Sequence, residues 1–174
     1  MIGIHRDKVR VVKYDPAWKK SFTIESKKVT RALGKDVLFV EHIGSTAIKG
    51  LAAKPIVDLF VVLSSLKNWE KYIEPLRKIG YTFRIDHKKD RGSILFTKGP
   101  VTKRTHHLKL VTKNSKNFKQ SLRFRDYLIS HPDVAKEYEK IKKGFAKKYK
   151  NNRVRYRVAK SAFIRKTLQR KVSR

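Results

Sequence analysis

The chain has 174 residues, of which 40% are hydrophobic and 10% aromatic, and it contains no cysteine. This composition excludes an intrinsically disordered chain, and the length predicts a single domain over residues 1–174. The lack of cysteine excludes a disulfide framework, a thiolate metal site and a cysteine nucleophile. The sequence has neither the apolar core of a signal peptide nor a membrane-spanning run, so we expect a cytoplasmic protein without membrane association.

Charge is the strongest compositional feature of the chain. It has 45 lysine and arginine residues against 14 aspartate and glutamate residues, a formal net charge of +31. The excess is uneven, because residues 1–100 carry +11 and residues 101–174 carry +20. Such a surface attracts polyanions over long distances, so RNA or another polyanion is a candidate partner of the C-terminal half. A generally lysine-rich background, unrelated to any partner, explains the charge equally well.

The first predicted element is a helix that starts at Asp15-Pro16 and stops at Gly34. Asp15 is a good helix cap, proline suits the first helical position, and glycine ends helices. Apolar side chains spaced by three and four residues, including Trp18, share one face of this helix. Glu25 falls among them and is expected at the rim of the buried face, the alternative being that it pairs with a buried basic residue.

Two strands joined by a short turn are predicted next. Val37–Val40 is rich in β-branched residues and predicts a buried strand, and Ile56–Leu63 predicts a second one. Gly44 ends the first run, and a helical turn is expected over Ala47–Ala53. Asp58 is the exception in the second strand. An unpaired buried carboxylate is costly, so Asp58 requires a partner, a metal ion or water.

The rest of the chain predicts short strands followed by a helical C-terminal part, roughly residues 115–174. A helix is expected over Leu66–Ile79, with a kink or break at Pro75. Short strands are expected at Tyr81–Arg84, Ser93–Thr97 and His107–Val111. Three helices follow, the first ending at Ser130-His131 and the second beginning at Pro132.

The second of these C-terminal helices has an apolar stripe with lysines on either side of it. The stripe is expected to pack in the core, because apolar residues at helical spacing form a buried face. Its members are Val134, Tyr138, Ile141, Phe145 and Tyr149, and the surrounding lysines are Lys136, Lys140, Lys143 and Lys147.

Residues suited to phosphate chemistry gather around Gly44-Ser45-Thr46. A glycine-serine turn at a helix start offers backbone N–H groups, hydroxyls and a positive dipole end to an anion. An acid on a nearby strand, such as Asp58, can hold a divalent cation that bridges to the phosphate. The alternative is an ordinary capped turn, with Asp58 paired to Lys54 or His42. The spacing of the glycines is not that of a Walker A loop.

The same stretch resembles a known family. The segment EHIGSTAIKGLAAKPIVDLFVV is similar to the signature of the GrpB-like (UPF0157) proteins, a branch of the nucleotidyltransferase superfamily. The similarity extends to VVKYDPAWKKSF, THHLKLV, LRFRDYLISHPDVAKEY and RYRVAKSAFI, and so to nearly the whole chain. It implies a nucleotidyltransferase-like α/β (α+β) fold, with a mixed sheet flanked by helices and a helical C-terminal third. It also implies a nucleoside triphosphate as ligand, with the Gly-Ser turn at its phosphates.

The resemblance further implies metal-dependent nucleotidyl or phosphoryl transfer. Enzymes of that superfamily hold two divalent ions with two acids one residue apart on a strand, where both face the same side. Here Asp58 is followed by Phe60, so the second acid is missing, and Glu41 is the candidate replacement. A divalent metal ion is expected at Asp58, His42 and His107. The ion would be Mg²⁺ or Mn²⁺, or Zn²⁺ if the imidazoles are ligands. A structural role for His107, hydrogen-bonded to a neighbour, is the alternative. Relatives often read His-Leu-His here, whereas this chain reads His107-Leu108-Lys109, which can instead place an ammonium near the phosphate.

Three basic residues complete the candidate site. An arginine on an apolar helix face, such as Arg125, can bind phosphate with its planar fork. The alternative for Arg125 is a buried pair with Glu41, Asp58 or Glu25. The basic candidates for phosphate binding are Lys54, Arg125 and Lys160.

Two functions follow from these observations. The first is a metal-dependent nucleotidyltransferase whose acceptor the sequence does not identify. The second is a catalytically degenerate module that binds a nucleotide, such as one of the coenzyme A type, or RNA through its basic C-terminal half. The missing acid at Phe60 favours the second function, and the arrangement of the Gly-Ser motif favours the first.

Overall fold

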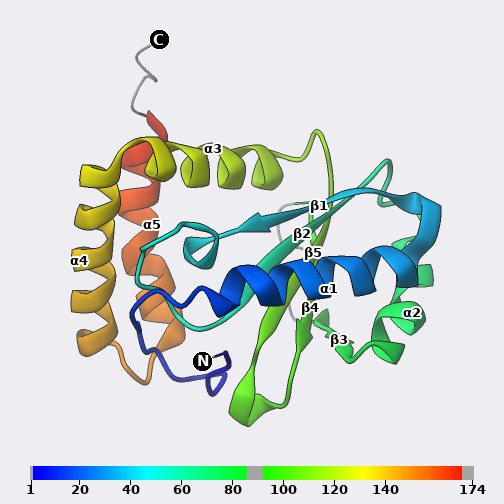
Figure 1. The fold of residues 1–174 in the computed structure, drawn as a ribbon, viewed down its shortest axis with the longest axis horizontal. Coiled ribbons are helices and arrows are strands. Elements are labelled where there is room, and N and C mark those ends of the chain that lie inside the picture. The colour runs from blue at the N-terminus through cyan, green and yellow to red at the C-terminus, as the bar shows by residue number, and fades with distance from the viewer. Residues whose placement is uncertain (1, 86–91, 170–174) are drawn as a thin grey trace.

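The structure, a computed structural model, describes residues 2–85 and 92–169. Its centre is a five-stranded mixed sheet in the order β1-β2-β5-β4-β3. Helix α1 crosses one face of the sheet, and α3, α4 and α5 gather at the end away from α2 (Figure 1). The strands are β1 (Val37–Ile43), β2 (Val57–Leu63), β3 (Tyr81–Phe83), β4 (Ile94–Lys98) and β5 (His106–Thr112). The helices are α1 (Ala17–Leu33), α2 (Ile73–Lys78), α3 (Lys116–Ser130), α4 (Pro132–Lys148) and α5 (Arg153–Gln169).

This architecture confirms the predicted α/β fold class, a mixed sheet flanked by helices with a helical C-terminal part. Strands β2 and β5 are parallel, whereas the β1–β2, β4–β5 and β3–β4 pairs are antiparallel. The parallel register places Asp58 beside His107 and Phe60 beside Lys109. Because side chains alternate between the two faces of a strand, these four share one face of the sheet. No helix in the described part of the chain is long and apolar enough to cross a membrane.

Helix α1 begins and ends as its sequence predicts. The Asp15 carboxylate accepts a hydrogen bond of 2.9 Å from the backbone N–H of Ala17. Gly34 adopts a positive φ of 66° after the last turn, a conformation that glycine allows at low cost. Trp18 is fully buried against the sheet.

Glu25 corrects one prediction about this helix. It is buried, not at the rim, and its Oε1 lies 2.6 Å from the Nζ of Lys98 at the end of β4. A carboxylate can be buried among apolar residues when a cation pairs with it. The pairing is the alternative expected for Glu25. Because the partner comes from a strand 73 positions later in the chain, the helix sequence alone did not identify which residue it is.

Several element boundaries also differ from the predictions. Strand β1 is the edge of the sheet and is only partly buried, with Leu38 52% exposed. The helical turn after it is a single 3₁₀ turn at Ser45–Ala47, earlier and shorter than expected. Helix α2 begins at Ile73, after a separate 3₁₀ turn. A proline without an N–H is tolerated only in the first turn of a helix, so Pro75 fixes this late start.

The C-terminal helices begin and end near the predicted positions, but the buried face of α4 is shifted. Three predicted members of its stripe, Ile141, Phe145 and Tyr149, are only partly buried. The residues that are buried lie at a spacing close to four, which keeps them in line along the inner side of the helix. They are Val134, Ala135, Tyr138, Lys142 and Ala146.

Candidate functional site: a basic cavity around Asp58

A cavity of about 410 Å³ opens between the start of β2 and the C-terminal helices. It is strongly basic, and among the described residues that line it Asp58 is the only acid. The predicted site residues at its wall are Gly44, Ser45, Thr46, Lys54, Asp58, His107, Arg125 and Lys160. Four further basic residues line it: Lys109, Lys142, Arg153 and Arg157.

Asp58 is held by the histidine beside it on the parallel strand. The Nδ1 of His107 lies 3.0 Å from Oδ1 of Asp58. The other ring nitrogen, Nε2, lies 3.4 Å from an Nη atom of Arg153, which can only donate. A neutral imidazole that donates from Nδ1 and accepts at Nε2 satisfies both contacts. The partner of Asp58 is therefore His107, and neither Lys54 nor His42 is bonded to it.

The charge state of the pair follows from its surroundings. Burial by itself would raise the pKa of Asp58, but the hydrogen bond from His107 and the charges of Lys54 and Lys160 lower it below its usual value. Burial lowers the pKa of His107, and Asp58 only partly offsets this. Asp58 is thus an anion beside a neutral histidine at pH 7. Its side chain remains 35% exposed, because it faces the cavity.

Gly44 brings the turn against this carboxylate. Its φ is +73°, and a Cβ built on it would lie only 2.7 Å from Oδ2 of Asp58. Real Cβ atoms do not approach an oxygen so closely, so a glycine is required here for two independent reasons. The Gly-Ser turn and the strand acid therefore meet at one point of the cavity wall.

The turn itself differs from the predicted helix start. Neither Ser45 nor Thr46 caps a helix, and the hydroxyl of Thr46 instead lies 3.1 Å from Nε2 of His42. A three-residue 3₁₀ turn is too short to develop a helix dipole. It can offer amides and hydroxyls to an anion but adds no dipole, so the positive charge of the cavity comes from its lysines and arginines.

Two of the lining lysines have strongly lowered pKa values. Burial, and next to it the charge of Arg153, lowers the pKa of Lys54 to about 7. Burial and the charge of Lys160 lower the pKa of Lys142 to about 7. Lys142 is 1% exposed and donates to the backbone carbonyl of Ala52. Both amines would regain a full positive charge if an anion entered the cavity, because an anion raises the pKa of a nearby amine.

Arg125 takes the ion-pair role that was the alternative to phosphate binding. Its Nη1 donates to Oε2 of Glu41 at 2.6 Å and to the carbonyl of His42 at 2.8 Å. Its Nε donates to Asp126 at 2.8 Å. These bonds fix α3 to the edge strand β1. Arg125 still lines the cavity, so the pairing positions it there.

Glu41 and His42 are not at the wall of this cavity. Both line a second cavity of about 400 Å³ beside α1, where the His42 ring stacks on Phe22 with centroids 4.6 Å apart. His42 pairs with Leu59 in the sheet, which turns its side chain to the face opposite Asp58. Burial lowers the pKa of His42 to about 4. Of the three predicted metal ligands, the structure brings together Asp58 and His107 only.

The sequence reasoning missed three basic residues of the cavity: Lys142, Arg153 and Arg157. Lys142 had a detectable signal, because it stands four residues after Tyr138 on the buried side of the helix. Lys109, which the sequence does place near the phosphate site, follows His107 at the two-residue spacing of one strand face and lines the cavity. Arg153 and Arg157 had no detectable signal, since only the packing of α5 on α3 and α4 brings them to the cavity wall.

Comparisons with known proteins place this chain in a family. The model of the GrpB protein family matches residues 8–170. The glutamate-rich protein GrpB of Alkalihalophilus pseudofirmus is 36% identical over 94% of this chain and 96% of its own length. The crystal structure of the conserved protein GrpB from Enterococcus faecalis superposes with a TM-score of 0.82 and 30% identity, covering 92% of this chain and 98% of that one.

A more distant relative is a larger enzyme. The dephospho-CoA kinase of Mycolicibacterium paratuberculosis is 30% identical over 80% of this chain but only 40% of its own length. The family model covers most of the chain, and two relatives are similar to it over nearly their full lengths, which together establish the family. The chain belongs to the GrpB protein family.

Proposed function

We propose that the protein binds a nucleoside triphosphate in the basic cavity and transfers a nucleotidyl or phosphoryl group from it with the help of a divalent ion. One observation carries the proposal. The Asp58 carboxylate and the Gly44 turn touch each other and face the same cavity, whose other charged side chains are all basic among the described residues. This arrangement pairs a cation ligand with a binding site for phosphates.

The residues at this site suit a divalent ion that is held jointly by the protein and by the phosphates of a bound nucleotide. No group of three acidic, histidine or cysteine side chains in the described ranges could hold a metal by itself. Mg²⁺, however, is usually held by one or two carboxylates together with the phosphates of the substrate. Asp58 supplies one such carboxylate, and His107 orients it. A bound ion would neutralise charge on the phosphates during transfer.

The basic residues have a separate role in this proposal. In phosphoryl and nucleotidyl transfer the protein contributes mostly positioning and charge stabilisation. The Nζ atoms of Lys54 and Lys160 lie 6.0 and 5.0 Å from the centroid of the Tyr156 ring, and both residues line the same cavity. Arg153 adds a guanidinium fixed on His107. Together they would hold the phosphates against the Gly44 turn.

A second candidate function rests on a specific observation. Phe60 stands on the same strand face as Asp58, where a second acid would stand, and it is 1% exposed in an apolar cluster. Glu41 faces Phe60 in the neighbouring strand, but its carboxylate is engaged by Arg125. The cavity would then bind a nucleotide without transferring from it.

A thermal-shift experiment separates the two functions. The melting temperature is measured with ATP, UTP, ADP and coenzyme A, each with EDTA, Mg²⁺, Mn²⁺ or Zn²⁺, because a ligand of the native state raises it. The transferase proposal predicts a nucleotide shift that grows with the divalent ion. It also predicts that Asp58→Asn, which keeps an oxygen for His107, loses only this ion-dependent part.

The controls define the contradicting results. Arg153→Gln together with Lys160→Gln should abolish the shift with and without the ion, because both remove phosphate contacts. An ion-independent shift, equal in Asp58→Asn and the parent, would support the binding module and remove Asp58 from transfer. No shift with any of these nucleotides in the parent protein would overturn both functions.

A further inference from the structure

Helix α4 has two faces with different roles. Its inner face packs on the body of the protein and contributes Tyr138 and Lys142 to the cavity described above. Its outer face is exposed and carries lysines at intervals of four, three and four residues, so their Cα atoms lie along one side of the helix although the side chains diverge from it. These are Lys136, Lys140, Lys143 and Lys147, all exposed.

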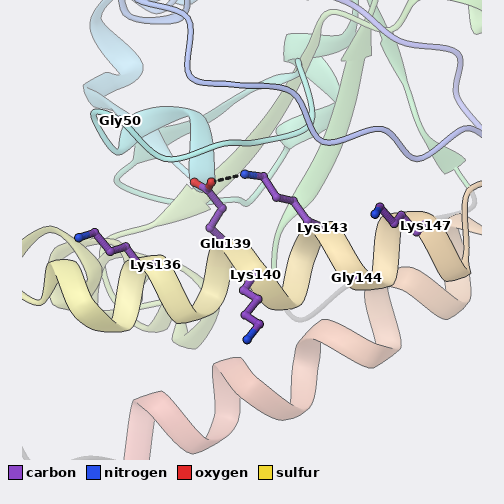
Figure 2. A pocket seen from close by; sticks show the side chains of 7 residues that line it. All are labelled: Gly50, Lys136, Glu139, Lys140, Lys143, Gly144 and Lys147. Atoms are coloured by element: carbon purple, nitrogen blue, oxygen red, sulfur yellow. Dashed lines mark hydrogen bonds and ion pairs between the residues drawn. The ribbon is translucent and has the colours of Figure 1, made fainter.

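The outer lysines line a groove distinct from the central cavity. The groove has a volume of about 590 Å³ and runs between α4 and the segment at Gly50. Figure 2 shows Glu139 and Lys143 reaching toward that segment while Lys140 points to the other side of the helix. Its described lining consists of four lysines, one glutamate and two glycines, without an apolar side chain.

Most of this charge has no counter-charge among the residues that the structure describes. Lys143 is paired with Glu139, Nζ to Oε1 at 2.5 Å. Glu139 also accepts a 2.7 Å hydrogen bond from the backbone N–H of Ala52, so it is fully engaged. No carboxylate of the described residues pairs with Lys136, Lys140 or Lys147.

Gly144 on the same face is an independent observation. A glycine inside a helix is less favourable than alanine, so it usually has a structural reason. Here a Cβ at Gly144 would meet nothing within 4 Å, and its φ lies outside the range that favours glycine. The fold therefore does not require this glycine. What it does provide is an opening in the row of lysine side chains, where another molecule can approach the helix backbone.

We infer that this groove on α4 binds the phosphodiester backbone of single-stranded RNA. The four lysines span eleven residues, about 16 Å along the helix, which matches an extended charged strand better than a single small anion. A protein partner would need apolar anchors that the groove lacks. The lysines come from one helix and so follow one phosphate backbone, as a single strand has, and RNA supplies most single strands in a cell.

This inference is independent of nucleotide transfer in the central cavity. The two sites share no lining residue, and they lie on opposite faces of α4. Loss of one should therefore leave the other intact. If both proposals hold, the helix would carry an RNA strand on its outside and a nucleotide on its inside.

The experiment compares two triple variants by fluorescence anisotropy with a labelled 20-nucleotide RNA. One variant, Lys136→Gln/Lys140→Gln/Lys147→Gln, neutralises the groove. The other, Lys20→Gln/Lys27→Gln/Lys28→Gln, removes the same charge from exposed positions on α1. We expect the groove variant to lose at least tenfold in affinity at low salt. Its slope of log K against log salt should fall by about 2, since each phosphate contact to a single strand contributes about 0.7.

The α1 variant should keep most of the affinity and the slope. Equal losses in both variants would show a general charge effect and overturn the inference. Tighter binding of the DNA 20-mer of the same sequence, or of anionic vesicles, would replace RNA as the occupant and would also overturn it. The nucleotide-dependent thermal shift of the groove variant should match that of the parent, which tests the groove separately from the central cavity.

A second variant changes the shape of the groove without changing its charge. Gly144→Leu should fold at least as well as the parent, because leucine is a better helix former and has space there. We expect it to weaken RNA binding at least fivefold while the melting temperature stays equal or rises. Unchanged RNA affinity would show that the strand does not approach Gly144 and would overturn the inference.

Discussion

Gly44 serves both the fold and the candidate site, because its backbone forms the turn and its lack of a side chain makes room for Asp58. The backbone at Gly44 has a positive φ, and its missing side chain leaves room for the Asp58 carboxylate. Gly50 in the following segment also has a positive φ, but a Cβ there would meet nothing within 4 Å. Comparing substitutions at the two glycines therefore distinguishes the cost of a positive φ from the cost of contact with the Asp58 carboxylate.

Gly44→Ala should destabilise the protein more than Gly50→Ala. Both substitutions place alanine at positive φ, which costs about 1–2 kcal/mol. Only the Gly44 variant must also displace Asp58, so it should lose additional free energy of unfolding and the nucleotide-dependent thermal shift. Urea unfolding of the two variants measures the difference. Equal losses would show that the carboxylate moves away without cost.

Lys142 makes stability depend on pH. Its pKa is about 7 in the folded protein and near its ordinary value of 10.5 in the unfolded chain. Between these values the unfolded chain binds a proton that the folded chain has released. Raising the pH through this window therefore favours the folded state, by at most about 1.4 kcal/mol per pH unit.

We expect the free energy of unfolding of the parent to rise relative to that of Lys142→Met as pH goes from 7 to 9. The methionine keeps most of the volume but cannot bind a proton. Urea unfolding at several pH values measures the two slopes. Parallel curves for the two proteins would show that Lys142 keeps an ordinary pKa in the folded state.

At the level of elements, the buried pair of Glu25 and Lys98 joins α1 to β4. Glu25 is 4% exposed, and its partner Lys98 lies on β4. Strand β4 is next to the edge strand β3, at the far end of the sheet from β1. Removing one member of a buried pair leaves an uncompensated charge, whereas replacing both with apolar groups is often tolerated. The pair thus determines where the helix sits, more than how stable the protein is.

Lys98→Met alone should lower the free energy of unfolding by about 3–5 kcal/mol, because it leaves Glu25 buried without a cation. The double variant Glu25→Met/Lys98→Met should recover most of this loss. Arg77→Met, which breaks an exposed pair with Glu74, is the control and should change stability very little. A double variant no more stable than the single one would show that the pair itself contributes the stability.

At the scale of the whole molecule, charge works against folding. The chain has a net charge of +31 on 174 residues. The repulsion between these charges is stronger in the compact folded state than in the extended unfolded chain, so it destabilises the folded state. The basic residues of the cavity and the lysine groove on α4 concentrate this repulsion on the C-terminal helices. Screening by salt or neutralisation by an anion relieves it.

The melting temperature should therefore rise as NaCl is increased from 0.05 to 0.5 M. For a chain of this size, each kcal/mol gained corresponds to about 2–4 °C. Tripolyphosphate at the same ionic strength should add to the increase by occupying the cavity, and Arg153→Gln/Lys160→Gln should lose this extra part. A melting temperature that falls with NaCl would show that attractive pairs outweigh the repulsion.

The sequence also predicted most of the elements, because their signals are local. The Asp15-Pro16 start and Gly34 stop of α1, the apolar run of β2 and the break before Pro132 are set by neighbours within a few residues. The predicted element boundaries were wrong where the local sequence signal was weaker. The single 3₁₀ turn after Gly44 was predicted as a longer helical turn, and α2 was predicted to begin several residues too early.

The sequence by itself determined the fold class, through its resemblance to the GrpB-like proteins. It also determined the position of the Gly44 turn and the presence of one acid in an apolar strand, since periodicity and turn chemistry are properties of adjacent residues. Only the tertiary structure decided the partners. It paired Asp58 with His107, Glu25 with Lys98 and Arg125 with Glu41, and it turned His42 to the opposite face. The physical reason is that sheet register and helix packing join residues far apart in the chain, and a buried charge takes whichever partner that packing supplies.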